Sequence, residues 1–428
     1  MRNPRILSAK ILQSILEDKV FFSDLKEQVA EENRAFVNML VLNTLRNLIP
    51  LQKTLANYLK KKIAHKNRVA EYLLLLAIEE LLEMNTPVYA VLDSTVKNIR
   101  MQSDMFLANM ANAVLRNICR NIEQVKSEFA KMNKLPQSFK DLLQGYNKEQ
   151  ISAIKNSISE IAPVDLSVKE KQQEWADKLD AMLLPNGSLR LQQNAKIPDL
   201  VGYKKGKWWV QDVAASLPAI IIGDLSGKTV ADLCAAPGGK TAQLALTAEK
   251  VYAFDISEAR LERLKENMER LNLSDKIEAI NADSSQYLKE NLKLKFDVVL
   301  LDAPCSATGT FRRHPEVLHI KNIDDVNTQI EMQKKLLQTA AESLKPNGIL
   351  VYSVCSIAKA EGEEQIQSFL AENPNFEIVP ITQKEVSVFG AWNDNFILEN
   401  GTIRTLPYYA QNIGGIDAFF ICKLQKIN

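Results

Sequence analysis

The sequence predicts a protein of several domains: an all-helical region, a small α+β module, and an α/β domain with a mostly parallel sheet. Up to about residue 128, apolar residues recur at helical spacing. From about residue 206, short apolar strands alternate with amphipathic helices. The length of 428 residues is enough for two or three domains. We therefore expect domains at 1–128, 129–205 and 206–428.

The first region has the pattern of a helical bundle. "ILSAKILQSILED", "RAFVNMLVLNTLRNLIPLQKTLANYL" and "RVAEYLLLLAIEELLEM" repeat apolar residues every three or four positions. Pro87 interrupts the pattern, and "LANMANAVLRNICRNI" resumes it. This region lacks the composition of a catalytic site, so we expect a structural or docking module.

The middle region is mixed. "APVDLSVK" and "SLRLQQ" predict short strands, "KEKQQEWADKLDAML" predicts a helix between them, and "LPQSFKDLLQGYNKEQISAIKNSISE" is expected to be helical. Gly187 and Gly202 mark turns.

The last region predicts a parallel sheet with helices on both faces. "TVADLCAA", "KVYAFDIS", "IEAINAD", "FDVVLLDAP" and "GILVYSVCS" are strand-like runs separated by helical ones. The final "DAFFICKLQK" is expected to be an antiparallel strand.

Composition limits the kind of protein. Hydrophobic residues make up 46% of the chain and the net charge is +1, so we expect packed cores and only a local patch for nucleic acid. Five scattered cysteines favour a reducing compartment, and three histidines without a C-x-x-C pair argue against a structural zinc site. The longest apolar run is broken by Glu79 and Glu80. The start of the chain resembles an amphipathic helix, not a signal peptide. We therefore expect a cytoplasmic protein without a membrane span.

The stretch "ADLCAAPGGKTAQLAL" predicts a ligand-binding turn between a strand and a helix. A P-loop would need glycine where Cys234 stands, and a dinucleotide site would need G-x-G-x-x-G, which is absent. The third interpretation is a nucleoside cofactor without pyrophosphate, approached closely by glycine backbone.

Acidic residues near the ends of successive strands support the third interpretation. Asp255 follows the glycine turn by about twenty residues, where a carboxylate can bind ribose hydroxyls. An acid at a strand end is often just a helix cap. Helix capping is a less complete explanation when acids stand at four successive strand ends, and the pattern fits binding of S-adenosylmethionine. The four acids are Asp232, Asp255, Asp283 and Asp302.

Two cysteines are placed for chemistry at the same sheet edge. Cys305 lies in "DAPCSATGTFRRHPE" and Cys355 in "VYSVCSI". A thiolate that attacks carbon 6 of a pyrimidine makes carbon 5 able to accept a methyl group. Spacing alone does not show which sulfur attacks. Cys119 and Cys422 are expected to be structural.

These motifs resemble those of the RNA cytosine-5 methyltransferases over nearly the whole chain. "DLCAAPGGKT" is similar to the family's cofactor loop, "DAPCSATGTFRRHPE" to its fourth motif and "VYSVCSI" to its sixth; "WVQDVAAS" and "RTLP…GGIDAFF" also match. "EYLLLLAIEELLEM" and "ANAVLRNICR" resemble a NusB-like RNA-binding domain. The resemblance implies a Rossmann-like, class I S-adenosylmethionine-dependent methyltransferase domain.

The resemblance also implies residue roles. It makes Cys355 the nucleophile, Cys305 the residue that assists release, and Asp302 the contact to the cytosine ring. The implied S-adenosylmethionine pocket consists of Cys234, Ala235, Ala236, Pro237, Gly238, Gly239, Lys240, Asp255, Asp283 and Asp302. The chain departs from the family at Val213, Val354 and Ala418, and "APVDLSVK" matches poorly.

Basic residues suggest where RNA phosphates bind. Arg312, Arg313 and His314 follow the Cys305 loop. A second cluster lies in the helical region and has a plain solvated face as its alternative: Lys60, Lys61, Lys62, Lys66 and Arg68. Trp208 and Trp209 are expected in the core.

The expected function is methylation of carbon 5 of a cytosine in 16S ribosomal RNA, free or partly assembled, by a monomer without a metal. One alternative is the same chemistry on transfer RNA or another ribosomal site. Another is a NusB-like RNA-binding factor with an inactive methyltransferase domain, which the joint presence of Asp302, Cys305 and Cys355 argues against.

Overall fold

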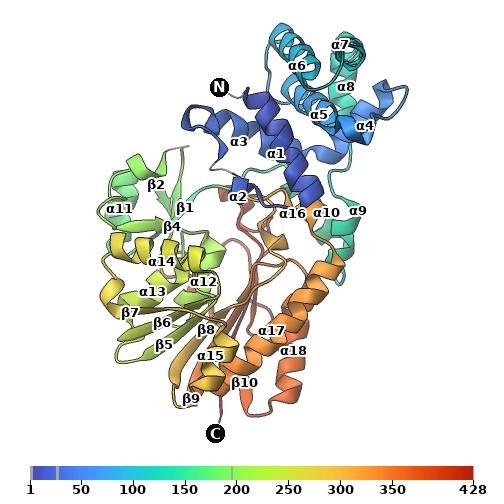
Figure 1. The fold of residues 1–428 in the computed structure, drawn as a ribbon. Helices are drawn as coiled ribbons and strands as arrows, with labels where there is room; N and C mark the ends of the chain where they lie inside the picture. Colours follow the sequence, from blue (N-terminus) through green and yellow to red (C-terminus); the bar gives the residue numbers. More distant parts are fainter. Residues whose placement is uncertain (1–2, 26–27, 194–195, 428) are drawn as a thin grey trace. The chain divides into compact units, whose positions relative to one another are not determined.

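The chain forms two compact units in the computed structural model, which describes residues 3–25, 28–193 and 196–427 (Figure 1). The first unit comprises Met1–Asp141, Ile151–Ser159 and Phe311–Lys321. The second comprises Leu142–Gln150, Glu160–Thr310 and Asn322–Asn428. The three-part division expected from the sequence stays a prediction, because the chain passes between the two units several times.

The first unit is helical, as predicted. Its helices include α1 (Pro4–Asp18), α2 (Phe22–Leu25), α3 (Glu31–Arg46), α4 (Leu48–Tyr58), α5 (Arg68–Leu82), α6 (Val88–Gln102), α7 (Met105–Arg120), α8 (Ile122–Phe129) and α9 (Gln137–Lys140). Helix α5 is buried around its whole circumference, which its apolar run requires. No helix in the described part of the chain is long and apolar enough to cross a membrane.

The segment Phe311–Lys321 packs in the first unit although it follows the fourth-motif strand in sequence. It contains the short helix α16 (Val317–Ile320), and Ile320 joins the helical core. The His319 Nε2 lies 2.7 Å from the Leu45 carbonyl oxygen. The rings of Phe311 and Phe139 meet edge to face, with centroids 5.8 Å apart.

A small antiparallel sheet confirms the strands predicted in the middle region. Its order is β2-β3-β1-β4, from β1 (Asp165–Val168), β2 (Ala181–Leu183), β3 (Leu189–Leu191) and β4 (Trp208–Val210), with α11 (Gln172–Leu179) between β1 and β2. The stretch before it is not one helix. Gly145, with φ of +80°, separates α9 and a 3₁₀ turn from α10 (Lys148–Ser157).

The second unit is built on an eight-stranded sheet with the order β10-β12-β9-β8-β5-β6-β7, and β11 pairs with β12. The parallel strands are β5 (Thr229–Leu233), β6 (Lys250–Asp255), β7 (Ile277–Asn281), β8 (Phe296–Asp302) and β9 (Leu344–Val354). The last strand, β12 (Phe420–Lys426), is antiparallel, as predicted. The short antiparallel strands β10 (Phe376–Ile378) and β11 (Ile403–Arg404) were not predicted.

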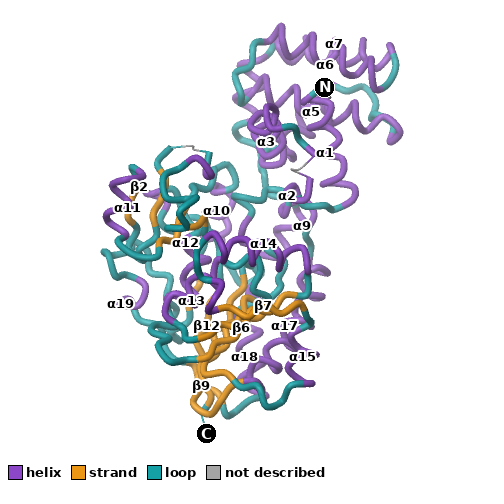
Figure 2. The backbone as a smooth tube through the Cα atoms, turned by 60° about the vertical axis from the view of Figure 1, so that its left-hand side comes forward, coloured by secondary structure: helices purple, strands orange, loops and turns teal. Residues whose placement is uncertain are grey.

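Helices cover both faces of this sheet (Figures 1 and 2). One face packs on α12 (Val213–Ile220) and α13 (Gly239–Thr247), and α14 (Glu258–Arg270) lies beside them. The other face packs on α15 (Ser284–Glu290), α17 (Ile323–Ser343) and α18 (Glu363–Glu372); a short α19 (Gln383–Val386) precedes the end strands. Alternate residues supply the two cores: Val299 and Leu301 face one side, Val298 and Leu300 the other.

The pairing of β8 with β9 brings the two cysteine motifs together. The strands are parallel, and Asp302 is in register with Ser353. Beyond the strands, the Gly309 amide donates to the Cys355 carbonyl over 2.9 Å. A Cβ at Gly309 would lie 2.0 Å from the Ala418 carbonyl oxygen, so this close approach requires glycine.

Substitution of Trp208 tests whether this side chain stabilises the core of the small sheet. It is fully buried, and its Nε1 donates to the Val201 carbonyl over 3.0 Å. We expect Trp208→Ala to destabilise the protein by about 3–5 kcal/mol, because it leaves a cavity and an unpaired carbonyl. Urea unfolding followed by circular dichroism measures the change. Leu292→Ala, at an exposed position, is the control, and equal stability of both variants would contradict the core assignment.

Candidate active site

The sulfurs of Cys305 and Cys355 lie 3.4 Å apart, close enough for a hydrogen bond with either as donor. Cys305 lies three residues beyond β8, and Cys355 directly follows β9. Both are half-buried. The hydrogen bond with Cys355 and burial hold the pKa of Cys305 well above its ordinary value, so Cys305 carries its proton near neutral pH.

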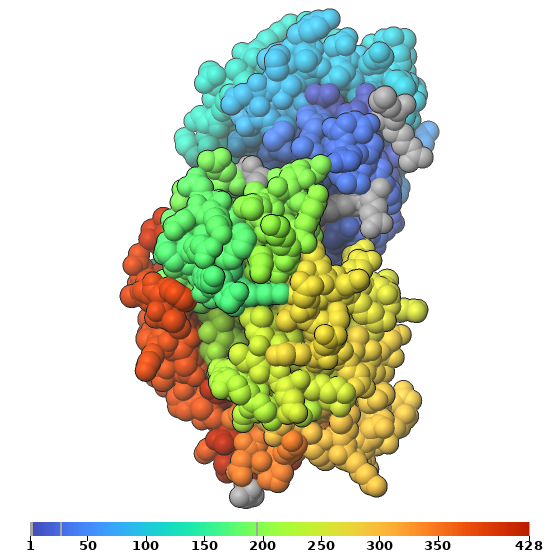
Figure 3. Space-filling model, turned by 90° about the vertical axis from the view of Figure 1, so that its left-hand side faces the viewer, coloured from blue at the N-terminus to red at the C-terminus, as the bar shows by residue number. Residues whose placement is uncertain are grey.

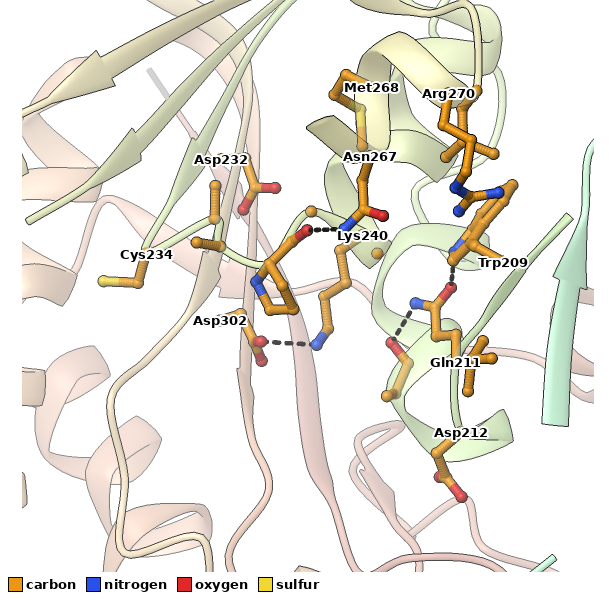
Figure 4. A pocket seen from close by; sticks show the side chains of 18 of the residues that line it. Trp209, Gln211, Asp212, Asp232, Cys234, Lys240, Asn267, Met268, Arg270 and Asp302 are labelled. Atoms are coloured by element: carbon orange, nitrogen blue, oxygen red, sulfur yellow. Dashed lines mark hydrogen bonds and ion pairs between the residues drawn. The ribbon is translucent and has the colours of Figure 1, made fainter. Parts of the chain in front are cut away.

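Asp302, the last residue of β8, forms an ion pair with Lys240 beside the cysteines. The Lys240 Nζ lies 2.6 Å from the Asp302 Oδ2, and the Ser353 hydroxyl donates to the Oδ1 over 2.8 Å. Burial disfavours the charged Lys240, but Asp302 outweighs this effect and raises the pKa of Lys240 above its ordinary value. The site therefore presents a fixed acceptor and a fixed cation side by side (Figure 4).

A cavity of about 360 Å³ lies against this pair. Its floor is the glycine turn, and its walls come from the end of the small sheet and from α14 (Figure 4). Lining residues include Cys234, Ala235, Ala236, Pro237, Gly238, Gly239, Lys240 and Asp302, as expected, together with Trp209, Gln211, Asp212, Asp232, Asn267, Met268 and Arg270. The sequence therefore predicted the lining residues of the glycine turn, but not those from the small sheet and α14.

Arg270 joins the two walls of the cavity. Its Nη1 donates to the carbonyls of Tyr203 and Trp208, over 3.0 and 3.2 Å. Figure 3 shows the segment that holds the small sheet, in green, against the segment that holds α14, in yellow. Both segments belong to the second unit, so the cavity is complete within it.

The glycine turn is shaped for close approach of a ligand. Gly238 has φ of +100° and precedes α13, and a Cβ there would meet Leu264 and Met268 at 3.0 Å. The amide of Ala236 donates to the Asp255 Oδ2 over 3.1 Å. Asp255 therefore holds the backbone of the turn in place, while Cys234 to Lys240 line the cavity.

Asp232 is a fully buried acid beneath the same turn. Burial raises the pKa of Asp232 to about 7, although the Thr241 hydroxyl donates to it over 2.6 Å. Burial also raises the pKa of the Cys234 thiol to about 12. A neutral thiol at this position can contribute to the pocket wall but is a poor nucleophile.

Asp255 and Asp283 do not line the cavity. Asp255 is buried by its contacts with the turn. Asp283 caps α15, accepting from the Ser285 amide over 2.8 Å, and its other oxygen lies 3.4 Å from the Lys335 Nζ. The helix-cap explanation therefore holds for Asp283, and its cofactor role stays a prediction.

The basic residues separate into buried and exposed groups. Arg312 is only 1% exposed, which corrects the interpretation of its side chain as a surface contact to phosphate. Arg313 and His314 are half-buried, and Lys60, Lys61 and Lys62 are exposed between α4 and α5. Arg68 forms ion pairs with Glu71 at 2.6 Å and Glu17 at 3.3 Å. Trp208 and Trp209 are buried, as predicted.

Sequence reasoning assigned Lys240 to the cofactor pocket and missed its pairing with Asp302. The signal was available, because "GGKT" starts a helix at the same sheet edge as Asp302. Cys422 lies in the β12 core, and Cys119 packs partly buried against the helical core, as expected for structural cysteines.

The cavity residues fit a nucleoside cofactor without pyrophosphate. Glycine backbone and small apolar side chains suit close approach of a flat base, whereas the turn lacks the P-loop glycine that pyrophosphate needs. Such a pocket at the carboxyl edge of a doubly wound sheet defines a Rossmann-like S-adenosylmethionine-dependent methyltransferase.

Comparisons with known proteins identify the family. The family model described as 16S rRNA methyltransferase RsmB/F matches residues 219–425 of the sequence. The family model of NusB matches residues 2–120. A ribosomal RNA small subunit methyltransferase B from Vibrio vulnificus is 30% identical over 398 residues, 88% of this chain and 93% of the relative. The chain belongs to the RsmB/F family of rRNA methyltransferases, and it begins with a NusB domain.

Solved structures share the fold. The crystal structure of PH0851 has a TM-score of 0.77 at 21% identity and covers 100% of this chain and 99% of its own. A methyltransferase homologue from Pyrococcus horikoshii has a TM-score of 0.53 at 27% identity and covers 68% of this chain and 100% of its own. The expected fold class is thereby confirmed, and the chain is an S-adenosylmethionine-dependent rRNA methyltransferase.

Asp232 makes stability depend on pH. In the unfolded chain an aspartate ionises above about pH 4, whereas the folded protein keeps the Asp232 proton up to about pH 7. Raising the pH through this window favours unfolding, with a slope of up to about 1.4 kcal/mol per pH unit from this group. We expect Asp232→Asn to remove that slope.

Urea unfolding of the ligand-free protein at several pH values between about 4 and 7 measures the effect. Asp275→Asn, at an exposed position, is the control and should keep the wild-type slope. An unchanged slope in Asp232→Asn would show that this carboxyl is not the group responsible.

Proposed function

We propose that this protein methylates carbon 5 of a cytosine in 16S ribosomal RNA through a covalent bond between Cys355 and the base. The observation that carries the proposal is the 3.4 Å pair of Cys305 and Cys355 beside the Asp302–Lys240 ion pair. The family description supports the 16S substrate. The site is built from one chain, which supports action as a monomer.

The first step is attack by the Cys355 thiolate on carbon 6 of the ring. The new sulfur–carbon bond uses the sulfur electron pair, and the electrons of the carbon 5–carbon 6 double bond move into the ring. Carbon 5 would then bond to the methyl carbon that S-adenosylmethionine supplies when bound, while the bond between that carbon and the sulfonium sulfur breaks and its electron pair stays on the sulfur. The target base must be unpaired or turned out of a helix to reach the sulfur.

The Asp302–Lys240 pair recognises the ring and stabilises its charge. Cytosine has an amine donor at position 4 and an acceptor at nitrogen 3. The Asp302 carboxylate can accept from the amine, and the Lys240 ammonium can donate to nitrogen 3. The charge that develops on the ring during attack is then stabilised by the Lys240 ammonium. This sharpens the role expected for Asp302, because the carboxylate acts together with a cation.

Cys305 assists the release of the product. The proton on carbon 5 leaves to water, and its bonding electrons restore the ring double bond as the bond between carbon 6 and the Cys355 sulfur breaks. Because Cys305 keeps its proton, its S–H group can donate a hydrogen bond to the departing Cys355 thiolate.

Contacts to RNA phosphate are proposed for the exposed Lys60, Lys61 and Lys62 and for Arg313 and His314. Exposed or half-exposed cations suit phosphate contacts, which position an RNA without reading its sequence. Arg312 is left out because its side chain is buried.

The two cysteines should give opposite results when each is changed to alanine. Cys355→Ala removes the nucleophile, so methylation and covalent attachment to RNA should both be lost. Cys305→Ala leaves the nucleophile and slows elimination, so a protein–RNA adduct stable to denaturant should accumulate. Denaturing gels with labelled 16S RNA measure the adduct. Cys422→Ala, in the strand core, is the control. An adduct that forms with Cys355→Ala would reverse the two roles.

Deletion of the gene should remove one 5-methylcytosine from 16S ribosomal RNA. Bisulfite sequencing of ribosomal and transfer RNA from the deletion strain locates the site. Wild-type protein should restore the modification, and Cys355→Ala should not. Loss of a methylcytosine from transfer RNA alone would favour that alternative substrate, and no change in any RNA would favour an inactive RNA-binding factor.

A further inference from the structure

Glu361 is a buried acid close to both cysteines that the proposed chemistry does not use. It ends a 3₁₀ turn (Lys359–Glu361) six residues after Cys355, and its side chain has no exposed surface. Burying a charged carboxylate without partners costs several kcal/mol. The hydrogen-bond partners of Glu361 therefore indicate its role.

The Glu361 carboxylate accepts hydrogen bonds from four donors. Its Oε1 accepts from the Ser306 amide over 2.8 Å and from the Gln333 Nε2 over 3.0 Å. Its Oε2 accepts from the hydroxyls of Ser306 and Ser356. An ionised carboxylate offers about four acceptor positions, so this set uses its capacity fully.

Two of these partners are the residues that directly follow the reacting cysteines. Ser306 follows Cys305, and Ser356 follows Cys355. The same Gln333 amide also donates to the Pro304 carbonyl over 2.9 Å, on the other side of Cys305. One carboxylate thus connects the two loops that carry the sulfurs, which come from different strands.

We propose that Glu361 is a positioning residue that holds the Cys305 and Cys355 sulfurs in contact by clamping Ser306 and Ser356. The importance of this contact for methylation rests on the proposed function, whereas the clamp itself does not. Positioning of reacting groups to within an ångström affects rates by up to about a hundredfold.

The charge of Glu361 also favours the protonated form of Cys305. The groups that face Cys305 are Cys355, Glu361 and Tyr352, and Glu361 adds to the effects of the Cys355 hydrogen bond and burial that keep Cys305 protonated. The clamp thus positions the thiol and favours the donor form that release requires.

Glu361→Gln is the sharpest variant, because it keeps the shape and removes the charge and one acceptor. We expect kcat for RNA methylation to fall by about tenfold or more, while KM for RNA and for S-adenosylmethionine stays within about threefold. Ser306→Ala and Ser356→Ala each remove one clamp hydroxyl and should give smaller losses of the same kind. Ser343→Ala is the control: it removes a buried hydroxyl bonded only to the Ala340 carbonyl in α17.

A second measurement tests the clamp without RNA. Diamide oxidises two adjacent thiols to a disulfide and is itself reduced to the hydrazine, taking up the two thiol hydrogens. The rate at which a Cys305–Cys355 disulfide forms, followed by peptide mass spectrometry, reports how long the sulfurs stay in contact. We expect Glu361→Gln and both serine variants to slow it by about threefold or more relative to wild type and Ser343→Ala.

The two measurements separate the proposals. Slower disulfide formation in the clamp variants supports the clamp even if Cys355→Ala still methylates RNA, in which case only the proposed function fails. Disulfide rates at the wild-type level in Glu361→Gln and in both serine variants would overturn the clamp. A fall in kcat that Ser343→Ala shares equally would also overturn it, because the effect would then be general destabilisation.

Discussion

The parallel pairing of β8 with β9 is the interaction on which the active site depends. Strand β8 carries Asp302, β9 leads into Cys355, and their register sets Asp302 opposite Ser353. Both strands lie in the middle of the sheet, with β5 and β12 on their outer sides and helices on both faces. A slip of one residue would turn core side chains of either strand to the opposite face. The hydrophobic cores therefore fix the register that brings Asp302 and Cys355 to the same edge of the sheet.

An ion pair and a fully buried acid share this edge of the sheet. Asp302 is paired with Lys240, whereas Asp232, nearby in the cavity wall, has its pKa raised to about 7 by burial. The Thr241 hydroxyl donates to Asp232 over 2.6 Å, but this bond does not offset the effect of burial on its pKa. The arrangement places one fixed ion pair at this edge and limits negative charge around the glycine turn.

The sequence contained much of this architecture. Strand–helix alternation after residue 206 was predictable from periodicity, and the antiparallel last strand was predicted as well. The placement of both cysteines at one sheet edge follows from the regular topology of parallel sheets. What the local pattern did not contain was long-range: Arg312 was expected at the surface, but its side chain is buried. Asp283 caps α15, which was one of the two roles expected for it, and its cofactor role stays a prediction. Glu361 escaped notice because it stands in an acidic stretch typical of a solvated helix start. Its burial depends on Ser306 and Gln333, which are distant in sequence.

The segment Phe311–Lys321 has a consequence for biosynthesis. The helical unit looks like an N-terminal domain, yet Ile320 belongs to its core and His319 bonds to Leu45. A ribosome that has made the first 141 residues has therefore not yet made all of that unit. About 170 further residues, including strands β1 to β8, emerge before the segment Phe311–Lys321 does. The two units thus complete their folding as interdependent parts of one chain, and the connection that joins them begins six residues after Cys305.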